Sequence, residues 1–309
     1  MNIWSYFVFV GVLAASIVAL GRKWQLKPKH YLSWLAVVAA VGCVALATSR
    51  QSLPSAPWWL AVGVALALCY GLSLAAILYF FFRDPERTAP GDDRHLVSPA
   101  DGTIVYVKKI ENGRFPFAVK GKNTIPLSDF VDADFVPKQG TQIGIAMNFL
   151  NVHVNRSPIS GTVKLVRRIP GEFKSLKHIA SLLENERVLM VVENDGVALG
   201  MVQIASRLVR RIVPYVAEGQ LVAQGQRVGV IRFGSQVDLL IPAAPGWEVV
   251  VKVGDEVTAG ETVLVSRKDA HPSVCRDVDE DRAVLGRANE DRTHAVTIDR
   301  SGQERIANG

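Results

Sequence analysis

Three residues that lie far apart in the chain carry the side chains of a nucleophilic triad. Asp101 lies in "SPADGTI", His153 lies in "NVHVNRSP", and Ser235 follows Gly234 in "RVGVIRFGSQVDLLIP". A carboxylate that orients an imidazole lets the imidazole take the proton of a hydroxyl, which then becomes a nucleophile. Order along the chain does not restrict such a unit, so the three residues are candidates for one catalytic site.

Each candidate also has a purely structural interpretation. Gly-Ser between two short apolar runs is a common β-hairpin turn, because glycine tolerates the positive φ of such turns. His153 shares one face of an alternating strand with Asn151 and Asn155, as a half-buried structural histidine would. Asp101 can cap a turn through nearby backbone N–H groups. The rest of the chain must decide between these interpretations.

One internal repeat bears on Asp101. "SPADGTI", residues 98–104, recurs as "SPISGTV", residues 157–163, and Ser160 occupies the position of Asp101. The Ser-Pro and Gly-Thr pairs recur because both copies need the same turn before a strand. The turn itself does not require a carboxylate, although a side-chain cap remains one interpretation of Asp101.

A second repeat predicts the fold around the Gly-Ser pair. "GQLVAQGQRVGVI" and "GDEVTAGETVLVS" carry Gly and Val at the same spacing, 35 positions apart. The pattern predicts a pseudo-symmetric β unit with Gly234-Ser235 midway between the copies. It resembles the biotinyl/lipoyl hammerhead, whose exposed hairpin tip carries a modifiable lysine in carrier proteins. Short Val/Ile-rich runs between Leu96 and Arg267 agree with one compact, mainly β domain.

The first 82 residues predict an N-terminal transmembrane α-helical region. Three apolar runs, Ile3 to Leu20, Tyr31 to Thr48 and Pro57 to Phe82, are near or above the ~18 residues of a spanning helix. In the alternative, the first two runs form a weakly inserted hairpin and only the third anchors the protein. The first loop, "GRKWQLKPKH", is far more basic than the second, "SRQSLPSAP". The first loop and everything after Phe82 are therefore expected in the cytoplasm.

Composition limits the remaining classes of function. The net charge is +6, and the basic residues after the last span suit either anionic headgroups or a solvated basic surface. We expect no nucleic-acid partner. Cys43 and Cys69 lie in apolar runs and Cys275 in a polar segment, without disulfide or metal-ligand spacing. "GEFKSLKHIASLLENE" predicts an amphipathic helix that packs on the sheet or lies on a membrane surface. Residues 269–309 are polar and predict a disordered tail.

Four motifs together resemble one known family. "FFRDPERTAPGDDRHLVSPADGTIV", "MNFLNVHVNRSPISGTV", "GMVQIASRLVRRIVPYV" and "GQRVGVIRFGSQVDLLIP" are similar to the phosphatidylserine decarboxylase family, in its short branch with a Gly-Ser motif. The resemblance covers about residues 80 to 265. The first two apolar runs, the stretch "NGRFPFAVKGKNTIPLSDFVDADFVPKQG" and the polar tail exceed the usual short-branch pattern.

The resemblance implies a chain that cuts itself between Gly234 and Ser235. The Ser235 hydroxyl would attack the Gly234 carbonyl and convert the amide to an ester. Removal of the Ser235 α-proton would then expel the Gly234 carboxylate and leave dehydroalanine. Its imine tautomer would react with water and lose ammonia, which would leave a pyruvoyl group at the new N-terminus. His153, held by Asp101, is the implied base. Neutral imidazole is available for that role near pH 7.

The same resemblance implies the reaction and its setting. Phosphatidylserine in the cell inner membrane would lose carbon dioxide and become phosphatidylethanolamine, with the pyruvoyl group as electron sink and no metal. The implied organisation is a membrane region at 1–82, a decarboxylase β domain at 83–268 and a tail at 269–309. Both fragments of the cut proenzyme would stay associated, and homo-oligomerisation is left open.

Two functions from other classes fit parts of the sequence. A membrane-anchored, lipoyl-like adaptor without catalysis would also combine apolar spans with a β unit, but it would need long heptad segments that the sequence lacks. A metallopeptidase with a related β core would need His-x-x-Glu or clustered histidines, which are also missing.

Overall fold

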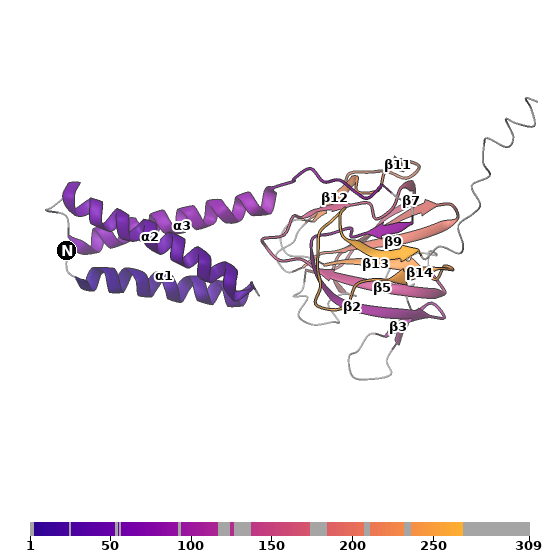
Figure 1. The fold of residues 1–309 in the computed structure, drawn as a ribbon, viewed down its shortest axis with the longest axis horizontal. Coiled ribbons are helices and arrows are strands. Elements are labelled where there is room, and N and C mark those ends of the chain that lie inside the picture. The colour runs from indigo at the N-terminus through magenta and orange to yellow at the C-terminus, as the bar shows by residue number, and fades with distance from the viewer. Residues whose placement is uncertain are drawn as a thin grey trace, which may run out of the picture. The chain divides into compact units, whose positions relative to one another are not determined.

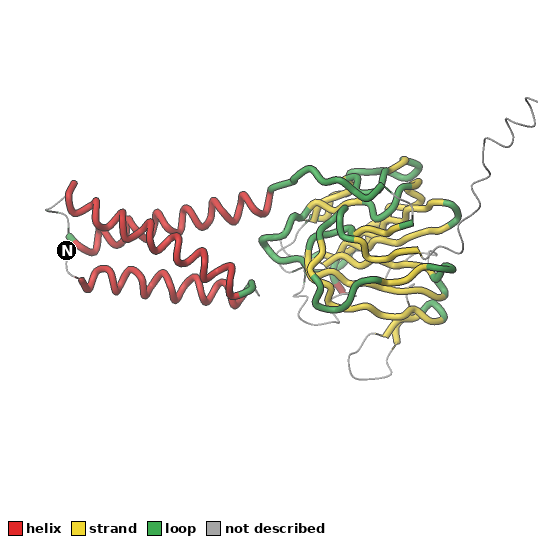
Figure 2. Tube along the Cα trace, in the orientation of Figure 1, coloured by secondary structure: helices red, strands yellow, loops and turns green. Residues whose placement is uncertain are grey.

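The structure, a computed structural model, describes residues 3–24, 26–52, 55, 57–91, 94–116, 124–126, 137–173, 184–206, 211–231 and 236–267. Three α-helices precede a mainly β region with one large, curled sheet (Figures 1 and 2). This confirms the predicted fold class. Gly234, Ser235, most of the predicted amphipathic helix and the predicted tail lie outside the described residues.

The helices coincide with the three predicted apolar runs. They are α1 (Ile3–Lys23), α2 (Pro28–Ser52) and α3 (Trp58–Phe82), each long and apolar enough to cross a membrane. Where they meet, they bury a small core that includes Phe9, Leu13, Leu46 and Cys69. Large apolar side chains also face outward, and Trp4 is 72% exposed. An apolar outer surface of this kind suits lipid rather than water.

The strands among the described residues form one large and two small sheets. The large sheet has the order β11 (Leu221–Val222), β7 (Gly161–Ile169), β8 (Arg187–Asn194), β9 (Val197–Ile204), β13 (Gln236–Pro242), β5 (Gln139–Ala146), β2 (Gly102–Glu111), β3 (Arg114–Pro116) and β4 (Thr124–Pro126), and β15 (Glu256–Val257) also pairs with β2. One small sheet has the order β10 (Ile212–Pro214), β12 (Arg227–Ile231), β6 (Val154–Arg156). The other has the order β1 (His95–Val97), β16 (Val263–Arg267), β14 (Trp247–Val249). Their apolar faces share one core, which includes Ile104, Ile143, Met190, Leu239 and Leu264.

Strand β13 lies in the middle of the large sheet. It pairs antiparallel with β5 on one side and with β9 on the other, and Gln236 is in register with both Ala146 and Ile204. The strand is buried from Gln236 to Ile241, so both of its faces are covered. The chain that follows residue 235 therefore enters the centre of the fold.

The two sequence repeats fold as two copies of one strand pair. Val257 of β15 lies opposite Gly102 of β2, and Val222 of β11 lies opposite Gly161 of β7. A Cβ on either glycine would come within 2.3 Å of a backbone carbonyl oxygen, which explains why both copies keep glycine there. These pairings agree with the predicted pseudo-symmetry. The closer resemblance to a biotinyl/lipoyl hammerhead stays a prediction.

Candidate active site

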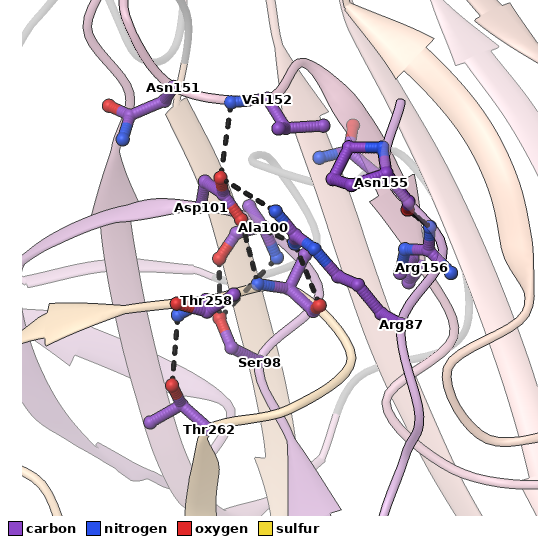
Figure 3. A network of polar contacts seen from close by, with 12 residues as sticks. Arg87, Ser98, Ala100, Asp101, Asn151, Val152, Asn155, Arg156, Thr258 and Thr262 are labelled. Carbon is purple, nitrogen blue, oxygen red and sulfur yellow. Dashed lines mark hydrogen bonds and ion pairs between the residues drawn. The ribbon is translucent and has the colours of Figure 1, made fainter. Parts of the chain in front are cut away.

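Asp101 is almost completely buried in a network of polar contacts (Figure 3). The guanidinium of Arg87 donates to both carboxylate oxygens, at 2.5 Å to Oδ1 and 3.0 Å to Oδ2. The backbone N–H of Ala259 donates to Oδ1 at 2.9 Å, and that of Val152 donates to Oδ2 at 3.1 Å. Two-point pairing with arginine fixes the orientation of the carboxylate. Removal of either partner would leave the charge of the other buried without a counter-ion.

The internal repeat separates the contacts of Asp101 into two kinds. In the second copy, Ser160 Oγ accepts a hydrogen bond from the N–H of Gln224 at 3.2 Å, and Gln224 is the repeat equivalent of Ala259. The bond to Ala259 is therefore the turn cap that both copies share. Simultaneous bonds to Arg87 and Val152 need a second oxygen and a negative charge, which a serine cannot supply.

His153 lies directly before β6 and is 1% exposed. Its Nδ1 atom lies 2.8 Å from the carbonyl oxygen of Asn151. A carbonyl only accepts hydrogen bonds, so in the neutral ring Nδ1 carries the proton and Nε2 carries the lone pair. The aromatic ring of Phe81, at the end of α3, packs on the imidazole.

Burial controls the ionisation of His153. Loss of water lowers the pKa of His153 to about 4, although the Asn151 carbonyl and the charge of Asp101 both raise it. The imidazole is therefore neutral near pH 7. A neutral ring with a defined tautomer has the protonation state that a general base requires.

Asp101 reaches His153 through the backbone. The sequence predicted that Asp101 holds the imidazole, and the contact at Nδ1 is with the carbonyl oxygen of Asn151. Asp101 holds the N–H of Val152, the residue before His153, and its charge raises the pKa of the imidazole. The structure thus brings the two residues together in one site. A direct bond between their side chains stays a prediction.

Ser235 and Gly234 lie outside the described residues, but both ends of the segment that contains them are described. At one end, the N–H of Ile231 in β12 donates to the carbonyl oxygen of His153 at 3.2 Å. At the other end, Gln236 begins β13 in the centre of the large sheet. The last described residue before Gly234 and Ser235 therefore contacts the backbone of His153, and the first one after them begins a central strand.

A second buried carboxylate follows closely, and sequence reasoning missed it. Asp238 accepts hydrogen bonds from Gln236 Nε2 at 2.7 Å, Tyr106 Oη at 2.6 Å and Gln142 Nε2 at 2.5 Å. Burial raises the pKa of Asp238, and the three hydrogen bonds lower it. The network ties the side chain of Gln236, the first residue after Ser235, to β2 and β5. In the sequence, the signal for this site was the charged residue Asp238 inside the apolar run "VDLLIP".

Sequence reasoning also missed Arg87 as a site residue. Arg87 belongs to a segment that is bonded to the β domain. In "RDPER", Asp84 accepts from Arg156 of β6 at 3.2 Å and from Arg227 of β12 at 2.5 Å. The alternating charges directly after an apolar helix were a usable signal. The segment holds the end of α3 beside β6, and therefore beside His153.

Comparison with known proteins places the chain in a family. A family model described as phosphatidylserine decarboxylase matches residues 74–265, about three fifths of the chain. The chain belongs to the phosphatidylserine decarboxylase family. The match to the phosphatidylserine decarboxylase model begins within α3 and includes Asp101, His153, Gly234 and Ser235. Helices α1 and α2 precede it.

Individual members of the phosphatidylserine decarboxylase family are similar over much of their length. The phosphatidylserine decarboxylase proenzyme of Novosphingobium aromaticivorans is 40% identical over 261 residues, which cover 82% of this chain and 88% of the relative. Proteins of the same name from Streptomyces griseus and Geobacter sulfurreducens are 38% and 33% identical. They cover 74% and 72% of this chain, and 88% and 91% of the relatives.

Proposed function

We propose that this chain is the proenzyme of a pyruvoyl-dependent decarboxylase. It cuts itself between Gly234 and Ser235 and then converts phosphatidylserine to phosphatidylethanolamine and carbon dioxide. Family membership and the proenzyme names of the relatives support this assignment. The geometric observation that carries it is the hydrogen bond between the N–H of Ile231 and the backbone carbonyl of His153, because it joins the described residue nearest before Gly234 to the residue that carries a buried, neutral imidazole.

The described residues have distinct roles in the proposed self-cleavage. His153 takes the proton of the Ser235 hydroxyl, which then attacks the Gly234 carbonyl. Asp101 is a positioning residue, because it holds the N–H of Val152 and its charge stabilises the imidazolium that forms. Arg87 holds Asp101 in place. In turnover, we assign to His153 the return of a proton to the substrate α-carbon.

The described residue that follows Ser235 supports the proposal of a covalent pyruvoyl group. Such a group supplies an electron sink for the electrons that remain when carbon dioxide leaves. Gln236 is 5% exposed, and its side chain bonds Tyr106 and Asp238, so the residue that follows the proposed pyruvoyl group is anchored in the sheet. A covalent group needs no separate cofactor-binding domain. This agrees with a site at the start of β13 and directly before β6.

We further assign the catalytic region to the cytoplasmic side of the cell inner membrane. The basic loop after α1 supports this assignment through the positive-inside rule. An ion pair between Lys27 of that loop and Glu256 of β15 agrees with it, because both groups must lie on the same side of the bilayer. Phosphatidylserine would then reach the site without leaving the membrane.

The proposal predicts two fragments from the full chain produced in membranes. Intact mass should show residues 1–234 and 235–309, the latter lighter by one ammonia than a fragment that begins with serine, and resistant to Edman degradation. Carboxyl-labelled phosphatidylserine should release labelled carbon dioxide. The Ser235→Ala variant should remain one chain of 33.7 kDa and release none.

The same measurements separate the enzyme from a lipoyl-like adaptor. An adaptor remains intact and releases no carbon dioxide. Membranes that decarboxylate phosphatidylserine while containing only the intact chain would contradict self-cleavage.

A further inference from the structure

A cavity of about 730 Å³ lies where the helices meet the β domain. Its apolar wall comes from α1, α2 and α3, including Ile17, Val37 and Ile77. Its polar end comes from the loop after α1, the first turn of α2, Arg83, Glu256 and residues 148–151. The volume falls within the range of about 300–1,000 Å³ that is usual for small-molecule sites. One apolar wall and one polar end match an amphiphilic ligand.

The polar end of the cavity is basic. Among the described residues that line it, Lys27, Lys29, His30 and Arg83 are basic and Glu256 is the one carboxylate. Glu256 pairs with Lys27. The remaining basic groups favour a ligand with a negatively charged head, such as the phosphate and carboxylate of a serine phospholipid.

Contacts between the helices and the β domain hold the cavity together. The rings of Trp24 and Phe149 pack with 4.9 Å between their centroids, and Arg83 Nη2 donates to the carbonyl oxygen of Leu150 at 3.1 Å. On the helix side, Trp34 Nε1 donates to Ser73 Oγ at 3.0 Å and ties α2 to α3. The walls are therefore formed before any ligand arrives, which lowers the entropic cost of binding.

The cavity adjoins the candidate active site. Asn151 lines it, and the carbonyl oxygen of Asn151 bonds Nδ1 of His153. The end of α3 contributes to both places, because Phe81 packs on His153 while Arg83 lines the cavity. Asn151 therefore contacts both the cavity and the proposed base.

We propose that this cavity binds the substrate phospholipid, with its anionic headgroup at Lys29, His30 and Arg83 and its acyl chains along α1, α2 and α3. The proposal rests on the proposed function. It gives α1 and α2, which precede the family match, a role in substrate binding beyond anchoring.

Two lysines of the same membrane face allow a matched kinetic test. Lys29 and Lys23 are both exposed and lie on either side of the loop after α1, but only Lys29 lines the cavity. In mixed micelles, Lys29→Glu should raise the phosphatidylserine mole fraction for half-maximal rate about tenfold, with a smaller effect on kcat. Lys23→Glu makes the same charge change and should raise this half-maximal mole fraction less than about twofold. Equal shifts would overturn the proposal, because they would reflect bulk surface charge.

A binding measurement does not depend on turnover. Uncut Ser235→Ala protein in nanodiscs should cross-link to a photoactivatable phosphatidylserine at residues 20–34 and 148–151. Lys29→Glu should reduce that yield severalfold, and Lys23→Glu should not. Cross-links outside the cavity, or unchanged by Lys29→Glu, would overturn the lipid site even if the parent decarboxylates. A parent that releases no carbon dioxide but cross-links as described would overturn the enzymatic function alone.

Discussion

The ring of Phe81 lies against the imidazole of His153, with 4.1 Å between the ring centroids and 39° between the ring planes. Phe81 is the second-to-last residue of α3, so a membrane helix ends on the proposed catalytic base. The contact helps to exclude water from the imidazole, and loss of water is the largest cause of its lowered pKa. In the proposed enzyme, this contact couples the apolar helix α3 to the acid–base chemistry of His153.

Replacement of Phe81 should change the ionisation of His153. Phe81→Ala admits water, so the pKa of His153 should rise towards its ordinary value of about 6.5 and the protein should lose about 3 kcal/mol of stability. The pH dependence of self-cleavage in detergent measures the first effect and thermal unfolding the second. Phe82→Ala is the matched control, because Phe82 is 61% exposed and Phe81 only 3%. Identical pH profiles for both variants would contradict the shielding role.

Self-cleavage should persist in mild acid. Because the pKa of His153 is lowered to about 4, the imidazole remains neutral through pH 5, and the acid limb of the rate should fall well below pH 6.5. The unfolded chain takes up this proton near pH 6.5. The contribution of His153 to stability is therefore complete above about pH 6.5 and is lost as the pH falls to about 4. Cleavage that halves near pH 6.5 would contradict the buried, neutral state.

Asp101→Ser tests whether Asp101 does more than cap a turn. The variant copies Ser160 of the second repeat and can keep the bond to Ala259, but it leaves Arg87 buried without its partner, at a cost of about 3 kcal/mol. Adding Arg87→Met removes that charge and should restore stability. Self-cleavage should stay slower by orders of magnitude in the double variant if Asp101 positions His153.

Fragment yield against time, with thermal unfolding as the folding control, measures both effects of Asp101→Ser. Ser160→Ala should change neither. A folded double variant that cleaves at the parental rate would reduce Asp101 to a structural residue.

Tyr106→Phe should weaken the anchor of Gln236. Tyr106 Oη donates to Asp238 and accepts from Gln236 Nε2, so its loss leaves two buried groups short of a partner and should cost about 1–3 kcal/mol. The bond from Tyr106 lowers the pKa of Asp238, so the cost should grow as the pH rises and Asp238 ionises. Slower cleavage should accompany it, because Gln236 follows Ser235. Tyr215→Phe, at a 51% exposed tyrosine, is the control for thermal unfolding at several pH values.

The sequence predicted those features that depend on local patterns. The apolar runs located α1, α2 and α3, because a helix that faces lipid needs an unbroken apolar surface. The repeats indicated the paired strands, because the close backbone approach at Gly102 and Gly161 excludes any side chain. His153 and Asp101 were proposed from residue type, and the structure shows that both are buried and that Asp101 bonds the residue before His153.

The missed features depend on contacts between distant segments. Arg87 and Phe81 become relevant only when the end of α3 lies beside β6, and no periodicity predicts that placement. Asp238 was hidden in an apolar strand because its partners come from β2 and β5. The bond between Nδ1 of His153 and Asn151 depends on the backbone path of one short turn.

The central position of β13 has a consequence for the lifetime of the cut protein. Proposed cleavage after Gly234 would assign β13 to β16 to the smaller fragment, whereas their partners β5, β9, β2 and β1 belong to the larger one. Release of the smaller fragment would require withdrawal of a buried strand from between two neighbours. Separation is then an unfolding reaction with a first-order rate, and dilution should not accelerate it.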